Sequence, residues 1–197
     1  MQIPFKTNHL AQVFSQENSN LFPPPPDRCP FKDCKMPVKL KKHGYYSRYL
    51  ISSRFKGVIF IRRYICPICG RTISFFPVFI LQRFTYSAID ILNLLFRFYK
   101  EGDPLSTFIE SVVNDFAFLS RRHLNYYRRR IIKNRKLIQY GLNLISPEFF
   151  PSSRIPDNQM WVKAFLTEVH NMDLQAFLFE FSMSTGKSFM TANNMVA

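Results

Sequence analysis

The chain has 197 residues, 47% of them hydrophobic and 20% charged, which suits one ordinary domain or two small ones with a packed core. Its 27 Lys and Arg outnumber the 13 Asp and Glu, for a net charge of +14. The longest uncharged runs have 11 residues, at positions 137–147 and 72–82, against about 18 for a spanning helix, and the N-terminus lacks the features of a secretory signal. We therefore expect a cytoplasmic, nucleoid-associated protein with no membrane segment.

The positive charge is concentrated in two segments. Residues 28–74 contain twelve Lys and Arg and one acidic residue, and residues 121–136 contain eight basic residues and no acidic one. Together the two segments carry more than the whole net charge. Such concentration indicates an anionic partner, and nucleic acid is favoured because no basic membrane-binding helix is evident.

The N-terminal segment, residues 1–27, is predicted to be a polar arm followed by a proline-rich spacer. Four consecutive prolines at positions 23–26 favour a stiff extended chain and cannot continue a helix or a sheet interior. We expect residues 1–22 to have little or no structure of their own.

Residues 28–80 are predicted to form a small antiparallel β domain. Tyr- and Ile-rich runs on either side of Gly57 predict a hairpin with strands near residues 44–53 and 58–65. A short third strand is expected at 72–76.

Two cysteine pairs flank this hairpin and predict a zinc site in it. Cys29 and Cys34 precede the strands, whereas Cys66 and Cys69 follow them with the pattern Cys-Pro-x-Cys-Gly. Four thiolates from two hairpin-like turns satisfy tetrahedral Zn²⁺ in a closed, structural site, known as a zinc ribbon. Four unrelated buried cysteines and a redox Cys-x-x-Cys are the less favoured alternatives.

The hairpin carries many basic residues interleaved with tyrosine, a composition typical of a surface that contacts phosphates. His43 lies among them. We favour a position for it on the surface or beside the zinc ligands over the alternative that it replaces one cysteine as a ligand. A solvated face without a partner would normally mix both charge signs. The predicted nucleic-acid contacts of this segment are Lys39, Lys41, Lys42, Arg48, Arg54, Lys56, Arg62 and Arg63.

From residue 81 to 145 the apolar spacing becomes helical. Ser87 and Gly102 are predicted to bound a first helix, and Asp103 with Pro104 is predicted to start a second that ends near Val113. Ser120 is expected to cap one long helix that continues to about residue 144. These three helices predict a helix-turn-helix-like unit, although the connection before Ser120 is longer than the usual three or four residues.

The third of these helices resembles a recognition helix at its start. Leu124, Tyr127, Ile131 and Ile138 are predicted to face the core, while the other face is basic. Arginine and asparagine at such positions reach guanine and adenine edges in the major groove. An exposed basic helix that joins domains or binds RNA is the alternative. The predicted contacts are Arg121, Arg122, Asn125, Arg128, Arg129, Arg130 and Lys133.

The C-terminal segment, residues 146–197, is predicted to contain one amphipathic helix at about 158–182. Its apolar residues include Trp161, Phe165, Met172 and Phe181. They either pack on the chain's own helices, which is favoured, or pair two copies in a homodimer. The predicted fold class is therefore α+β, an antiparallel zinc ribbon followed by an all-helical unit.

The cysteine-rich region resembles a family known from other proteins. The run Arg63-Tyr64-x-Cys66-Pro67-x-Cys69-Gly70-Arg71-Thr72, with Cys29-Pro30 and His43-Gly44 before it, is similar to an uncharacterised zinc-ribbon family of Gram-positive bacteria. That family resembles the zinc-ribbon and helix-turn-helix front ends of insertion-element transposases. The resemblance covers about residues 29–90, and it implies zinc-dependent DNA binding linked to a mobile element, with a transposase or recombinase as partner.

Three hypotheses follow for function. The first is a zinc-dependent DNA-binding protein without catalytic activity, an accessory or regulatory factor of a mobile element. The second is an interaction module or RNA-binding adaptor, in which the tyrosine-rich hairpin stacks on unpaired bases. The third is a truncated transposase without its catalytic domain, because the residues after position 136 are too few for a fold that presents metal-binding carboxylates.

Overall fold

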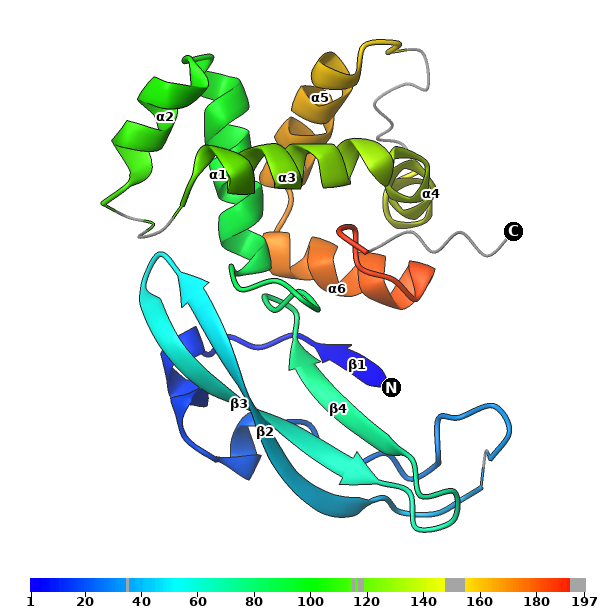
Figure 1. Ribbon diagram of the computed structural model, residues 1–197. Coiled ribbons are helices and arrows are strands. Elements are labelled where there is room, and N and C mark those ends of the chain that lie inside the picture. The colour runs from blue at the N-terminus through cyan, green and yellow to red at the C-terminus, as the bar shows by residue number, and fades with distance from the viewer. Residues whose placement is uncertain (35, 115, 117–118, 148–154, 192–197) are drawn as a thin grey trace. The chain divides into compact units, whose positions relative to one another are not determined.

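A computed structural model describes residues 1–34, 36–114, 116, 119–147 and 155–191 (Figure 1). The chain divides into two compact units, residues 1–78 and residues 79–197. Among the described residues, the first contains a four-stranded sheet and the second contains six α-helices, so the mixed α and β content expected from the sequence is confirmed. Each unit is described separately below.

The sheet of the first unit is built around a long hairpin. Strands β2 (Lys41–Ser52) and β3 (Phe55–Ile65) are antiparallel, β4 (Thr72–Pro77) pairs with β3, and β1 (Gln2–Phe5) completes the order β1-β4-β3-β2. The hairpin closes with Ser52 opposite Phe55, so its turn lies at Ser53 and Arg54. The three predicted strands are present, but Gly57 lies inside β3 and not in the turn.

The N-terminal segment differs from the expected unstructured arm. Strand β1 runs parallel to β4, with Gln2 opposite Ser74, and the 3₁₀ turns η1 (Ala11–Ser15) and η2 (Ser19–Leu21) follow it. Phe14 is fully buried and packs edge-to-face on Phe22, whose ring contacts that of Phe5. These phenylalanines anchor the segment because burying each large ring contributes about 1.5–3 kcal/mol.

The second unit contains only helices within the residues that the structure describes. Their bounds are α1 (Ala88–Glu101), α2 (Leu105–Val112), α3 (Arg121–Lys133), α4 (Arg135–Ile145), α5 (Asn158–Asn171) and α6 (Leu174–Thr185). Helix α1 packs on α5, and α4 packs on α6. In the described segments, no helix combines the length and apolarity that crossing a membrane requires.

The first helix has the ends that the sequence predicts. The Ser87 hydroxyl accepts a hydrogen bond from the Asp90 backbone N–H at 3.3 Å, and Gly102 ends the helix in the left-handed conformation, with φ of 73°. Helix α2 differs slightly because Pro104, rather than Asp103, occupies the N-cap position.

Two helices that were expected to be continuous are each divided. Helices α3 and α4 meet at Asn134, which is buried and donates hydrogen bonds through Nδ2 to the Phe189 and Thr191 carbonyls at 2.7 and 3.0 Å. Helices α5 and α6 are separated because Asp173 caps α6, its carboxylate accepting from the Ala176 N–H at 2.6 Å. In both cases the residue at the break has a polar side chain that forms hydrogen bonds with backbone atoms.

The core of the second unit contains the apolar residues that the helical spacing selected. Leu124, Tyr127, Ile131 and Ile138 are all buried, as predicted. Trp161 stacks on Phe165 with ring centroids 5.7 Å apart, and Phe177 contacts Phe165 and Phe181. The C-terminal aromatic residues therefore pack within this chain.

Candidate metal centre and basic surfaces

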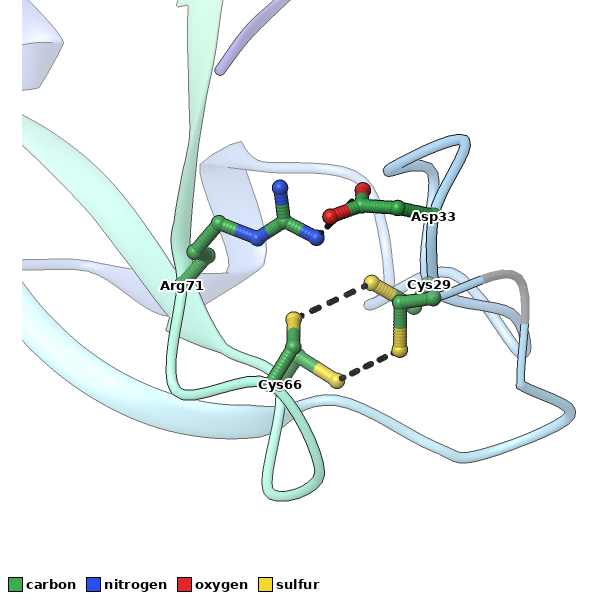
Figure 2. A network of polar contacts seen from close by, with 6 residues as sticks. Cys29, Asp33, Cys66 and Arg71 are labelled. Atoms are coloured by element: carbon green, nitrogen blue, oxygen red, sulfur yellow. Dashed lines mark hydrogen bonds and ion pairs between the residues drawn. The ribbon is translucent and has the colours of Figure 1, made fainter.

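Four cysteines of the first unit converge at one end of the hairpin. The sulfur atoms of Cys29, Cys34, Cys66 and Cys69 all lie within 4.8 Å of one another. The Cys29–Cys69 and Cys34–Cys66 sulfur separations are 3.7 and 3.9 Å (Figure 2), far longer than the roughly 2.05 Å of a disulfide. The cluster could hold a metal ion, and the sequence predicted all four of its members.

Backbone hydrogen bonds shape each of the two turns that carry the cysteines. In the second turn, the Gly70 N–H donates to the Cys66 carbonyl at 2.9 Å, and the Cys66 N–H donates to the Arg71 carbonyl at 3.0 Å. Gly70 has φ of 69°, a conformation that favours glycine. In the first turn, the Cys29 N–H donates to the Met36 carbonyl at 3.1 Å. Backbone hydrogen bonds therefore hold both pairs of thiols in position.

Arg71 links the two turns across the cluster. Its guanidinium donates to the Asp33 carboxylate at 2.6 Å (Figure 2). It also lies over the Phe31 ring, 4.1 Å from the centroid. Hydrogen bonds from the backbone N–H of Arg71, and then from its guanidinium, lower the pKa of Cys69 to about 6. The bond from Arg71 also lowers the pKa of Asp33. Arg71 thus stabilises negative charge on both turns.

The Cys29 thiol is less readily ionised than that of Cys69. Burial raises the pKa of Cys29 to about 12. A thiol must lose its proton to bind a metal, and the charge of the bound ion provides the driving force. His43 is exposed on β2 and is not a member of the cluster.

The basic residues of the hairpin separate into exposed and packed groups. Arg62 is only 6% exposed, and its guanidinium lies 4.6 Å from the Tyr45 ring centroid and 5.5 Å from that of Tyr64. Arg63 donates to the Tyr45 carbonyl at 3.3 Å, and partly buried Arg48 lies over Phe76 at 6.0 Å. These three arginines therefore pack within the unit. The exposed predicted contacts are Lys39, Lys41, Lys42, Arg54 and Lys56.

Helix α3 likewise presents part of its predicted basic face. Arg128 bonds to the Tyr99 hydroxyl at 3.2 Å and to the Asn125 side chain at 3.4 Å, so both residues are engaged inside the unit. Arg130 is partly buried, with its guanidinium 5.8 Å from the Tyr126 ring centroid. The exposed members are Arg121, Arg122, Arg129 and Lys133.

Three of these α3 side chains have no ion-pair partner in the described part of the chain. The side chains of Arg121, Arg122 and Arg129 form no ion pair or hydrogen bond with any described residue. The opposite side of the helix is apolar, since Leu124 and Ile131 are 0% exposed. The helix therefore directs uncompensated positive charge to solvent.

Sequence reasoning missed the contribution of Arg71 and Asp33 to the cysteine cluster. Their only sequence signal is proximity, because Asp33 precedes Cys34 and Arg71 follows Cys69 by two residues. Comparison with protein-family models, curated proteins and solved structures finds no match to this chain.

Proposed function

We propose that this chain is a zinc-dependent DNA-binding protein in which a zinc ribbon and a helix-turn-helix-like unit both contact phosphates. The observation that carries the proposal is the exposed face of α3, where Arg121, Arg122 and Arg129 lie without ion pairs among the described residues. Arginine is a common ligand of phosphate and of guanine edges in DNA.

Zinc fits the cysteine cluster by its donor set and by its dimensions. A tetrahedral zinc ion with Zn–S bonds of about 2.3 Å places its sulfurs about 3.8 Å apart. The Cys29–Cys69 and Cys34–Cys66 sulfur separations, 3.7 and 3.9 Å, lie on either side of this value. Cys29, Cys34, Cys66 and Cys69 would hold the ion. Zinc would act as a structural crosslink, since four protein thiolates leave no coordination position for substrate.

The exposed lysines of the hairpin support the same proposal. Lys41 and Lys42 begin β2, seven and eight positions after Cys34, whereas Arg54 lies at the opposite end of the hairpin, in the turn. No acidic residue occurs between Asp33 and Asp90. The hairpin therefore offers phosphate contacts along its length, and a metal that fixes its base would fix the positions of Lys41 and Lys42.

A salt titration of binding to a duplex oligonucleotide tests the proposal. Each phosphate contact contributes about −0.9 to the slope of log K against log salt. The double variant Arg122→Ala with Arg129→Ala should flatten the slope by about 1.8 and leave the melting temperature unchanged. Lys163→Ala removes an exposed lysine from α5, outside both basic segments, and is the control that should leave the slope unchanged. A wild-type protein that binds no duplex, or binds with a salt-independent affinity, would refute the proposal.

The link to a mobile element is a proposal that rests on the resemblance of residues 29–90 alone. It implies a regulatory or accessory factor that acts with a transposase or recombinase. RNA is the second candidate ligand, because exposed Tyr49 on β2 is suited to stacking on an unpaired base. Competition between duplex DNA and structured RNA of equal length separates the two ligands.

A further inference from the structure

At the Tyr49–Val58 pair, the β2–β3 hairpin has one buried face and one exposed face. Leu50 and Ile59 are 0% exposed on the first. Tyr49 and Val58 are directly opposite each other on the second, and they are 45% and 44% exposed. Because side chains alternate along a strand, the second face presents an aromatic ring and a branched aliphatic side chain to solvent.

A second aromatic residue extends this exposed face. Ser47 is paired with Phe60, one step along the hairpin and on the same side as Tyr49 and Val58. Phe60 is partly exposed and Ser47 is exposed. Diagonal neighbours across such strands lie roughly 7 Å apart. Tyr49 and Phe60 therefore form a small aromatic platform on this face of the hairpin.

The charge around the platform indicates its ligand. Arg54 is exposed in the adjoining turn, Lys56 is exposed on β3, and no acidic residue lies between positions 34 and 89. A ligand that matches both features carries flat apolar surfaces and a repeated negative charge. In a duplex the base faces are covered by their neighbours, whereas unpaired bases are free to stack on aromatic side chains.

We propose that this platform stacks unpaired bases of single-stranded nucleic acid, with the ring of Tyr49 against a base and Arg54 on an adjacent phosphate. This inference rests on the proposed function and specifies its substrate class, nucleic acid with unpaired nucleotides. The platform belongs to the first unit, whereas the basic face of α3 belongs to the second.

Fluorescence anisotropy with labelled oligonucleotides of equal length tests the inference, using single-stranded DNA, single-stranded RNA and duplex DNA. Stacking on one aromatic residue contributes about 1–3 kcal/mol. Tyr49→Ala should therefore weaken single-strand binding by roughly 5- to 150-fold and change duplex binding less than about 2-fold. Tyr49→Phe retains the ring and should bind as the wild type does. The ratio of the affinities for single-stranded DNA and single-stranded RNA identifies which nucleic acid the protein prefers.

Two further variants exclude loss of folding as the cause. Tyr49→Leu keeps an apolar side chain of similar exposure but has no π face, so it should behave as Tyr49→Ala does. Tyr140→Ala removes a tyrosine that is 57% exposed on α4 and should leave single-strand binding unchanged. If Tyr49→Ala binds single strands with wild-type affinity, the stacking inference is wrong while duplex binding still supports the proposed function. If the wild type binds none of the oligonucleotides, both fail.

Discussion

Arg71 and Asp33 form an ion pair of 2.6 Å that joins the two cysteine-bearing turns of the first unit. Both side chains are partly exposed, at 39% and 71%, so the pair contributes little to folding by charge attraction alone. Its significance lies in its position, because Arg71 also bonds to Cys69 and thereby lowers the pKa of that thiol. The pair orients the turns and favours one thiolate before a metal arrives.

Removing this ion pair should weaken metal binding. Residues that orient metal ligands typically contribute 10- to 100-fold to affinity, and we expect about a tenfold loss for Arg71→Ala and a smaller loss for Asp33→Asn. Competition with a chromophoric chelator measures the zinc affinity. Arg97→Ala is the matched control, since Arg97 pairs with Glu101 at 3.4 Å in the helical unit. An affinity unchanged in Arg71→Ala would show that the cysteines alone determine zinc binding.

Arg62 and Arg129 should respond in opposite ways to substitution by alanine. Arg62 is buried between tyrosine rings, so Arg62→Ala should lower the free energy of unfolding by about 1–3 kcal/mol. Arg129 is exposed, so Arg129→Ala should leave stability within about 0.5 kcal/mol and reduce DNA affinity. Urea unfolding and salt-dependent binding measure the two effects. Equal stability losses in both variants would contradict the assigned burial.

Gly141 should be intolerant of alanine even though it lies in a helix. A Cβ atom there would overlap the ring of Phe181 on α6, and overpacking costs about 1–3 kcal/mol. This cost opposes a helix-propensity gain of about 1 kcal/mol. We therefore expect net destabilisation by Gly141→Ala, measured by thermal unfolding. Exposed Asn143 on the same helix is the control, and Asn143→Ala should change stability by no more than about 0.5 kcal/mol. A higher melting temperature for Gly141→Ala would show that α4 and α6 are not in contact.

Glu168 introduces a pH dependence into the helical unit. Its side chain is on α5, the residue is only 6% exposed, and burial raises the pKa of its carboxyl. The folded state therefore favours the protonated form, and the charged form opposes folding above the folded-state pKa. Glu168→Gln should raise the melting temperature at pH 7. The difference in melting temperature between the variant and the wild type should shrink as the pH falls through the folded-state pKa of Glu168. It should vanish below the ordinary glutamate pKa of about 4.3. A melting-temperature difference that does not change with pH would show that the charge of Glu168 is not its cause.

The parts that sequence predicted are those set by local chemistry. The spacing of Cys66, Pro67, Cys69 and Gly70 predicts a thiol-bearing turn. The structure contains this turn, in which Gly70 has a positive φ. Ser87 and Gly102 likewise act on the backbone within a few residues, and both ends of α1 were predicted. The hairpin strands were predicted with ends that differ by no more than three residues.

Several parts that sequence missed depend on partners far along the chain. Strand β1 has four residues and includes Pro4, and it is stabilised by pairing with β4 about 70 positions later. Asn134 interrupts an otherwise helical pattern because its side chain bonds to carbonyls 55 and 57 positions away. The packing of Arg62 and Arg128 on aromatic rings also requires the folded structure. Composition alone could not distinguish these arginines from exposed ones.

The central claim is that four thiolates bind one zinc ion and thereby stabilise the basic hairpin. Native mass spectrometry of the purified chain tests it most directly, with the protein expressed in zinc-supplemented medium. We expect one zinc per chain, and none in the variant that carries both Cys66→Ser and Cys69→Ser. A wild-type protein that is metal-free and keeps the same fold and melting temperature as this variant would contradict the claim.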